Sequence, residues 1–184
     1  MRLLVATRNA HKLCEIRAIF SLPNLHLCST DDFPGLPEVV EDGDTFEANA
    51  IKKAVTTAKA AGAWALADDS GLEVDALNGE PGVHSARYAG EPVSYEANNR
   101  KLLAKLGDNS DRTARFRCVM ALSDPEGDVQ TVEGKCEGAI ARAERGEGGF
   151  GYDPLFVPQG HDQTFAEMDA TAKNAISHRG VALE

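Results

Sequence analysis

The sequence predicts an α/β fold, in which strands and helices alternate along the chain. An apolar run at residues 3–6 is followed at once by a helical pattern, and residues 45–61 and 94–106 also have helical spacing. Residues 114–122 alternate between apolar and polar side chains, which is typical of a half-buried strand. The chain of 184 residues is long enough to bury a sizeable core, and we expect one domain spanning residues 1–184.

The composition excludes several classes of partner. Lys and Arg number 19 and Asp and Glu number 29, so the formal net charge is −10, which argues against binding of a nucleic-acid polymer. A small anionic ligand held by local cations and a metal is compatible with this balance. No apolar run reaches membrane-spanning length, and the first residues do not resemble a signal peptide. The four cysteines form no CxxC pair, so we expect reduced thiols, no zinc and a cytoplasmic location.

A polar segment follows the first strand and leads into the first helix. Asn9 is the expected N-cap of this helix, whose apolar face carries Leu13, Ile16 and Phe20. The backbone N–H groups at a helix N-terminus favour anions, phosphate included. The glycines of a P-loop are missing, however, so an ordinary capped helix explains this segment alone at least as well. The segment consists of Thr7, Arg8, Asn9, Ala10, His11 and Lys12.

An acidic run precedes the second predicted helix. Residues 21–37 are expected to be irregular, with a short strand near residues 25–27. The helix is predicted to begin at Thr45 and to end before Gly62, which is a typical C-terminal stop. The acidic residues in 38–44 complement the helix dipole, and the alternative is metal coordination by Glu41.

The stretch at residues 63–74 is central to the functional interpretation. Its first half indicates a buried strand, and we expect Asp68 and Asp69 to lie where that strand meets a turn containing Ser70 and Gly71. Neighbouring strand residues point to opposite faces, so the two carboxylates should have different roles. Buried carboxylates must be paired, hydrogen-bonded or bound to metal. This stretch alone supports a turn and a site equally well.

The second half of the chain contains a third helix, two strands and a glycine-rich loop. Ser94 is expected to cap the helix, and the strands at 114–122 and 129–138 are expected to form an antiparallel hairpin. Glycines at residues 146–151 surround Phe150, which could stack on a planar base or pack in the core.

Basic residues gather near the end of the chain. Residues 164–167 fit a capping box, and a helix is expected to follow. On such a helix Lys173 lies one turn from Ser177, and His178 and Arg179 point elsewhere. These groups could bind an anion or the edge of a base, or they could form a solvated helix face.

Five motifs occur in the order and approximate spacing of one enzyme family. They are Thr7-x-Asn9-x-x-Lys12 and residues 67–72, 85–88, 148–154 and 176–179. Through them residues 3–183 resemble the inosine triphosphate pyrophosphatases, also called dITP/XTP pyrophosphatases. The last two motifs are highly specific. Relatives differ at Arg8 and His11, where glycine and a small residue are common, and they usually continue beyond Glu184.

The resemblance implies a fold and an activity. The fold would be an elongated mixed β-sheet flanked by helices, with two lobes and a central substrate cleft. The activity would be Mg²⁺-dependent hydrolysis of ITP, dITP or XTP to the monophosphate and pyrophosphate, which removes these nucleotides from the pool. The resemblance also implies a homodimer.

Residue roles follow from the same resemblance. Asp69 would be the catalytic base, and Glu41 and Asp69 would bind the metal. Asp68 would be a secondary metal or structural carboxylate. The substrate-binding residues would be Thr7, Arg8, Asn9, Ala10, His11, Lys12, Ser70, Phe150, Gly151, Tyr152, Asp153, Lys173, His178 and Arg179.

A donor-lined pocket would explain base selection. The 6-keto oxygen of inosine accepts hydrogen bonds, whereas the 6-amino group of adenine donates them, so His178 and Arg179 would reject adenine. Two other functions are compatible with parts of the pattern. One is a pyrophosphatase for modified pyrimidine triphosphates, which the motif ending in Arg179 disfavours. The other is a silent nucleotide-binding protein, which retention of Glu41 and Asp69 disfavours.

Overall fold

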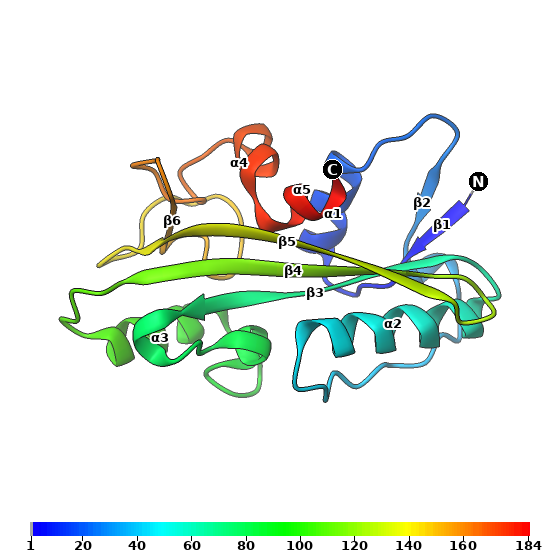
Figure 1. Ribbon diagram of the computed structural model, residues 1–184, viewed down its shortest axis with the longest axis horizontal. Helices are drawn as coiled ribbons and strands as arrows, with labels where there is room; N and C mark the ends of the chain where they lie inside the picture. Colours follow the sequence, from blue (N-terminus) through cyan, green and yellow to red (C-terminus); the bar gives the residue numbers. More distant parts are fainter. Residues whose placement is uncertain (1) are drawn as a thin grey trace. The chain divides into compact units, whose positions relative to one another are not determined.

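The computed structural model describes residues 2–184 and has the predicted α/β architecture (Figure 1). Its six-stranded sheet has the order β2-β1-β3-β4-β5-β6. The strands are β1 (Arg2–Val5), β2 (His26–Cys28), β3 (Ala65–Val74), β4 (Thr113–Ser123), β5 (Val129–Ile140) and β6 (Phe156–Pro158). The helices are α1 (Ala10–Ile19), α2 (Phe46–Ala61), α3 (Tyr95–Leu106), α4 (Ala170–Ile176) and α5 (His178–Leu183), with 3₁₀ turns η1 (Thr30–Asp32), η2 (Asp75–Leu77) and η3 (Gly82–Arg87).

The chain divides into two compact units. The first unit contains the residues up to Asp69 together with Cys118–Gly134 and Ala182–Glu184. The second unit contains Ser70–Arg117 and Lys135–Val181. Three boundaries between the units fall inside strands: after Asp69 in β3, after Arg117 in β4 and after Gly134 in β5. The fourth follows Val181 in α5.

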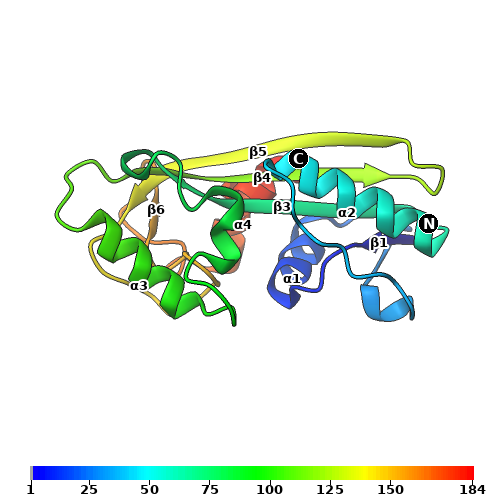
Figure 2. The same ribbon diagram turned by 90° about the horizontal axis from the view of Figure 1, so that it is seen from below.

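Helices cover both faces of the sheet in the first unit. β1 pairs in parallel with β2 and with β3. Because strand side chains alternate between faces, Leu3 and Val5 pack with Ile16 of α1, whereas Leu4 packs with Ala58 of α2. Figures 1 and 2 show α1 and α2 on opposite sides of these strands. Strands covered on both faces are typical of parallel α/β sheets.

The predicted caps Asn9 and Ser94 are confirmed, and α2 begins one residue later than predicted, with Thr45 as its cap. The Asn9 side chain accepts from the backbone N–H groups of His11 and Lys12. Thr45 and Ser94 cap α2 and α3 in the same way, each through its side-chain oxygen. These bonds satisfy orphan N–H groups of the first helical turn, so short polar residues mark the helix starts in the sequence.

The predicted turn at Asp68 and Asp69 is wrong. β3 continues through both residues and through Gly71, and nearly all of its ten residues are buried. The turn propensity of Asp, Ser and Gly is overridden because both faces of the strand are covered and the two carboxylates have partners on neighbouring helices.

The core of the second unit is built around aromatic rings. Phe116 contacts Phe156 edge-on, with ring centres 4.7 Å apart, and stacks near Phe165 at 5.9 Å. Leu102 and Leu106 of α3 belong to the same buried cluster. β4 and β5 are neighbours joined by a tight turn, as the predicted hairpin requires, and β5 pairs antiparallel with β6.

The end of the chain differs from the prediction in two places. Residues 164–167 form a turn rather than a helix start, with one bond of the predicted capping box present: Glu167 Oε2 accepts from the Thr164 N–H at 2.7 Å. The other bond is missing, because the Thr164 hydroxyl donates to the Arg145 carbonyl. The following helix is capped by Asp169 and ends at Ile176. Ser177 adopts an extended conformation, and a separate helix, α5, begins at His178.

Candidate functional site

The phosphate-binding segment proposed from the sequence follows the carboxyl end of β1. Asn9 donates its backbone N–H to Thr7 Oγ1 at 3.2 Å, and its side chain caps α1. The register pairs Val5 with Leu66 in parallel strands, so the segment starts level with the middle of β3. Loops at the carboxyl ends of parallel strands are a common place for ligands in α/β proteins.

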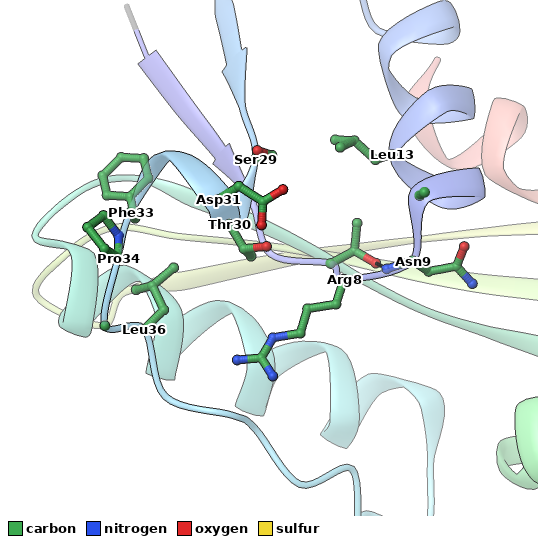
Figure 3. Close-up of a pocket in the computed structure, with 12 residues that line it drawn as sticks. Arg8, Asn9, Leu13, Ser29, Thr30, Asp31, Phe33, Pro34 and Leu36 are labelled. Atoms are coloured by element: carbon green, nitrogen blue, oxygen red, sulfur yellow. Dashed lines mark hydrogen bonds between the residues drawn. The ribbon is translucent and has the colours of Figure 1, made fainter. Parts of the chain in front are cut away.

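A cavity of about 560 Å³ lies beside this segment within the first unit. Figure 3 shows Leu13 and Asn9 on one side of it and Ser29, Thr30 and Phe33 on the other. Arg8 also lines the cavity, and its guanidinium lies 3.7 Å from the Glu38 carboxylate. Both side chains of that pair are largely exposed, so the ion pair contributes little to stability.

The two adjacent carboxylates of β3 face different helices. Asp68 Oδ2 lies 2.9 Å from Lys12 Nζ of α1, and the Asp68 side chain is fully buried. Asp69 Oδ2 accepts a hydrogen bond of 3.0 Å from Asn49 Nδ2 of α2. The strand alternation therefore gives the two carboxylates different partners, with an ion pair on one face and an amide contact on the other.

Lys53 and Glu41 complete the charged group around Asp69. Lys53 Nζ lies 3.0 Å from Glu41 Oε1, and only 11% of the Lys53 side chain is exposed. Lys53 and Asn49 lie outside the sequence motifs and were not among the predicted site residues. Both fall among the buried positions of α2. Because a buried polar residue needs a partner, such positions on a helix indicate candidate site residues.

Burial raises the pKa of the Asp69 carboxyl to about 6. The charges of Lys12 and Lys53 and the hydrogen bond from Asn49 oppose this rise, while the charge of Glu41 adds to it. Asp69 is therefore a stronger base than an ordinary aspartate and is still mostly ionised at pH 7. Both properties suit a general base.

The oxygen donors present fit Mg²⁺. The charge of Glu41 acts on Asp69, so the two predicted ligands share one electrostatic environment. Within residues 2–184, no group of three or more His, Cys, Asp and Glu side chains could hold a metal by itself. Mg²⁺ is commonly bound by one or two carboxylates with water and substrate phosphates, so this donor set fits an ion that also uses phosphate ligands.

The glycine-rich loop of the second unit is fixed by Asp153. Its Oδ2 accepts from the Phe150 backbone N–H at 2.8 Å and from Lys173 Nζ at 2.5 Å. A Cβ at Gly149, where φ is +70°, would lie 2.1 Å from Asp153 Oδ2, so only glycine fits there. Lys173 Nζ lies 5.2 Å from the centre of the Phe150 ring. Asp153 thus holds the loop and the lysine beside a half-buried aromatic ring.

His178 and Arg179 point into the second unit. The His178 ring stacks on Phe116, with centres 4.7 Å apart and planes 14° apart. Arg179 is 1% exposed, and its Nη2 donates to Ser70 Oγ at 3.0 Å. A Cβ at Gly180 would lie 1.9 Å from the Asn174 carbonyl oxygen, so glycine permits α5 to pack against α4. A buried guanidinium such as that of Arg179 is costly unless it is paired or hydrogen-bonded.

Tyr152 and Ser85, which belong to two of the five motifs, have core positions. Tyr152 is buried and its hydroxyl donates to the Ser85 carbonyl at 2.8 Å. Ser85 Oγ accepts from Leu72 N and donates to Gly82 O, so it supports the fold. Substrate binding by Tyr152 stays a prediction, and its side chain is already engaged in the core.

The predicted site residues lie in two groups, one in each unit. The first group comprises Thr7, Arg8, Asn9, Ala10, His11, Lys12, Glu41 and Asp69. The second comprises Ser70, Phe150, Gly151, Tyr152, Asp153, Lys173, His178 and Arg179. Arg8 and His11 are exposed, whereas Asp69, His178 and Arg179 are buried.

Residues 3–184 match the family model described as the Ham1 family. The chain belongs to the Ham1 family. A relative in Desulforamulus reducens named dITP/XTP pyrophosphatase is 56% identical over 186 residues, which cover 100% of this chain and 92% of the relative. A protein of the same name in Geobacter sulfurreducens is also 56% identical, over 99% of this chain and 92% of its own length.

A solved structure agrees with this Ham1 assignment. A Ham1 protein from Coxiella burnetii is 43% identical, matches with a TM-score of 0.91, and covers 100% of this chain and 94% of its own. The predicted family and fold class are thereby confirmed. In residues 2–184, the helices are all too short or too polar to cross a bilayer.

Proposed function

We propose that this Ham1-family protein hydrolyses ITP, dITP and XTP to the nucleoside monophosphate and pyrophosphate and so removes them from the nucleotide pool. The curated relatives that bear the name dITP/XTP pyrophosphatase support this proposal. The observation that carries it is Asp69, a buried carboxylate with a raised pKa that lies within the influence of Lys12, Lys53 and Glu41. We further propose that the enzyme is a cytoplasmic homodimer, as the family resemblance implies.

The first unit would bind the triphosphate. Lys12 and the N–H groups at the start of α1, which Asn9 presents, favour phosphate oxygens. Thr7 adds a hydroxyl donor. The protein and the substrate are both negative, so these few cations are essential for attraction.

Asp69 would take a proton from the attacking water. Glu41 and Asp69 would hold Mg²⁺ together with the substrate phosphates. When bound, Mg²⁺ offsets phosphate charge and makes a coordinated water easier to deprotonate. The hydrogen bond from Asn49 Nδ2 to Asp69 Oδ2 would hold the carboxylate in position for this proton transfer. Lys53 balances the negative charge of Glu41.

The second unit would bind the base. Phe150 supplies a half-buried ring for stacking, with Lys173 beside it. Lys173, His178 and Arg179 are donors that can pair with a 6-keto oxygen. Adenine presents a donor at that position, so binding it would leave a buried donor unpaired.

A panel of nucleoside triphosphates tests this function. With Mg²⁺ present, pyrophosphate release from ITP and XTP should exceed that from ATP by at least about 100-fold in kcat/KM, because a mismatched hydrogen bond in a buried site costs several powers of ten. Coupled detection of pyrophosphate measures it. Equal turnover of ATP and ITP would refute base selection, and faster turnover of modified pyrimidine triphosphates would support the alternative substrate class.

His178 variants test the source of selectivity. His178→Ala should narrow the ITP-to-ATP ratio of kcat/KM by about tenfold or more, since one donor is lost. His178→Phe is the matched variant, because it keeps a ring against Phe116 and removes both ring nitrogens. Both variants should narrow the ratio. An unchanged ratio in His178→Phe would place base recognition on other residues.

A further inference from the structure

Asn49 is a buried amide on the face of α2 that packs against the sheet. It is 2% exposed and all of its polar atoms have partners. Its Nδ2 donates to Asp69 Oδ2 at 3.0 Å and to the Gly43 carbonyl at 3.4 Å. Its Oδ1 accepts from the Gly43 N–H at 2.8 Å. One planar side chain therefore joins the strand that carries Asp69 to the loop that carries Glu41.

This arrangement couples the orientation of two carboxylates. Asn49 bonds both the N–H and the carbonyl of Gly43, which lies two residues after Glu41. Lys53 follows Asn49 by one helical turn and holds the Glu41 carboxylate at 3.0 Å. α2 thus restrains the Glu41 loop in two ways. Asn49 holds the loop backbone at Gly43, and Lys53 holds the Glu41 side chain.

The close fit at Gly43 is a second observation. A Cβ at this position would lie 2.7 Å from Asn49 Oδ1 and 3.0 Å from the Ala48 Cβ. The backbone of Gly43 therefore packs closely against the Asn49 amide. The amide has little room to move, because its Nδ2 is also bonded to Asp69 Oδ2. An added methyl group would displace Asn49 without removing any hydrogen-bonding group.

We propose that Asn49 is the positioning residue of the hydrolytic centre, setting the Asp69 side chain and the Glu41 loop in one arrangement. The proposal rests on the proposed Mg²⁺-dependent function. Its role is to hold both carboxylates ready before the metal and nucleotide bind. Groups that orient metal ligands through hydrogen bonds typically change metal affinity or activity by 10- to 100-fold when they are lost.

Three variants separate positioning from simple stability. Asn49→Leu removes every hydrogen bond of the amide at similar volume. Gly43→Ala keeps Asn49 and Asp69 but crowds their contact. Thr57→Val is the matched control, since Thr57 is another buried polar residue of α2, two turns further along. Circular dichroism first confirms folding. The electron paramagnetic resonance signal of free Mn²⁺ then gives metal affinity with pyrophosphate present, because Glu41 and Asp69 are too few to hold the ion without phosphate ligands.

The expected results differ between the variants. Asn49→Leu should weaken Mn²⁺ binding by about tenfold and lower kcat for ITP by roughly 10- to 100-fold. The KM for ITP should change by less than about threefold, because substrate contacts are retained. Gly43→Ala should shift both quantities in the same direction by less, and Thr57→Val should leave both unchanged.

Several outcomes would overturn the proposal. A folded Asn49→Leu variant with wild-type Mn²⁺ affinity and kcat would do so, as would equal losses in Thr57→Val. The proposal would also fail if Glu41→Gln left the Mn²⁺ affinity of the wild-type chain unchanged. If the wild type releases no pyrophosphate from ITP or XTP, the proposed function fails, while the Mn²⁺ comparison still decides the role of Asn49.

Discussion

Replacing Asp69 with asparagine is expected to reduce pyrophosphate release from ITP by about three orders of magnitude, in the range typical for loss of a general base. The amide oxygen can still accept the hydrogen bond from Asn49, so the local structure should persist. A phosphate assay coupled to pyrophosphatase, at saturating Mg²⁺, measures the rate, and calorimetry measures nucleotide binding.

A matched change elsewhere provides the control for that experiment. Asp124→Asn makes the same substitution at a carboxylate that accepts from Gly127 and Asp128 in the β4–β5 turn. It should retain full activity. If Asp69→Asn also retained near-normal activity, Asp69 would lose its assignment as the base.

The same Asp69→Asn variant should be more stable than the wild type when metal and nucleotide are absent. In the folded protein the pKa of Asp69 is about 6 instead of 3.8, so the folded state binds this proton more tightly than the unfolded state. The contribution of Asp69 to stability therefore falls as the pH rises from about 4 through 6. Ionising a carboxyl whose pKa is about 6 in the folded protein, instead of 3.8, costs roughly 3 kcal/mol of folding free energy.

Urea unfolding at two pH values checks this linkage. The variant should exceed the wild type in free energy of unfolding by roughly 3 kcal/mol at pH 7.5, and the difference should nearly vanish at pH 4. A difference of equal size at both pH values would contradict the assignment of the effect to the Asp69 proton. Catalytic residues commonly lower stability in this way, because function places a charge where folding disfavours it.

Lys12→Met is expected to have the second large effect, on both stability and substrate binding. It leaves the fully buried Asp68 carboxylate without its lysine, and breaking a buried pair in this way costs about 3–5 kcal/mol. Asp68→Asn should cost less, because Lys12 is 15% exposed and can turn toward water. Thermal unfolding measures both losses.

The double variant separates the two roles of Lys12. Lys12→Met with Asp68→Asn removes both charges, so stability should recover relative to Lys12→Met alone. The KM for ITP should stay raised, because the proposed phosphate contact is still missing. Recovery of KM together with stability would show that Lys12 acts only through the ion pair.

The sequence predicted elements well where local chemistry decides them. Asn9, Thr45 and Ser94 cap their helices because a short side-chain oxygen satisfies N–H groups within three residues. The continuation of β3 through Asp68 and Asp69 was missed because its cause is not local. Partners from α1 and α2, far away in the sequence, make two buried carboxylates tolerable inside a strand.

The residues of the candidate site also divide into those that the local sequence indicates and those that depend on distant partners. The family motifs led to Asp69 and Glu41, and the alternation of a strand predicted separate roles for Asp68 and Asp69. Asn49 and Lys53 were missed because no motif contains them. Lys53 was also expected on the polar side of its helix, as lysines usually are, whereas it lies among the buried positions of α2. Their partners depend on which strand lies against that face, and only the folded chain shows this.

The alternation along β3 also determines how such an enzyme can lose its activity in evolution. A one-residue insertion or deletion between Leu66 and Asp68 would exchange the faces of both carboxylates, because strand side chains repeat every two residues. An insertion would bring Asp68 to the position that faces the Asn49 amide and move Asp69 beyond it, whereas a deletion would bring Asp69 to the position that faces Lys12 and move Asp68 away from it. In both cases every functional residue is still present. A single-residue gap at this point would therefore mark an inactive gene copy in which all the motifs are still readable.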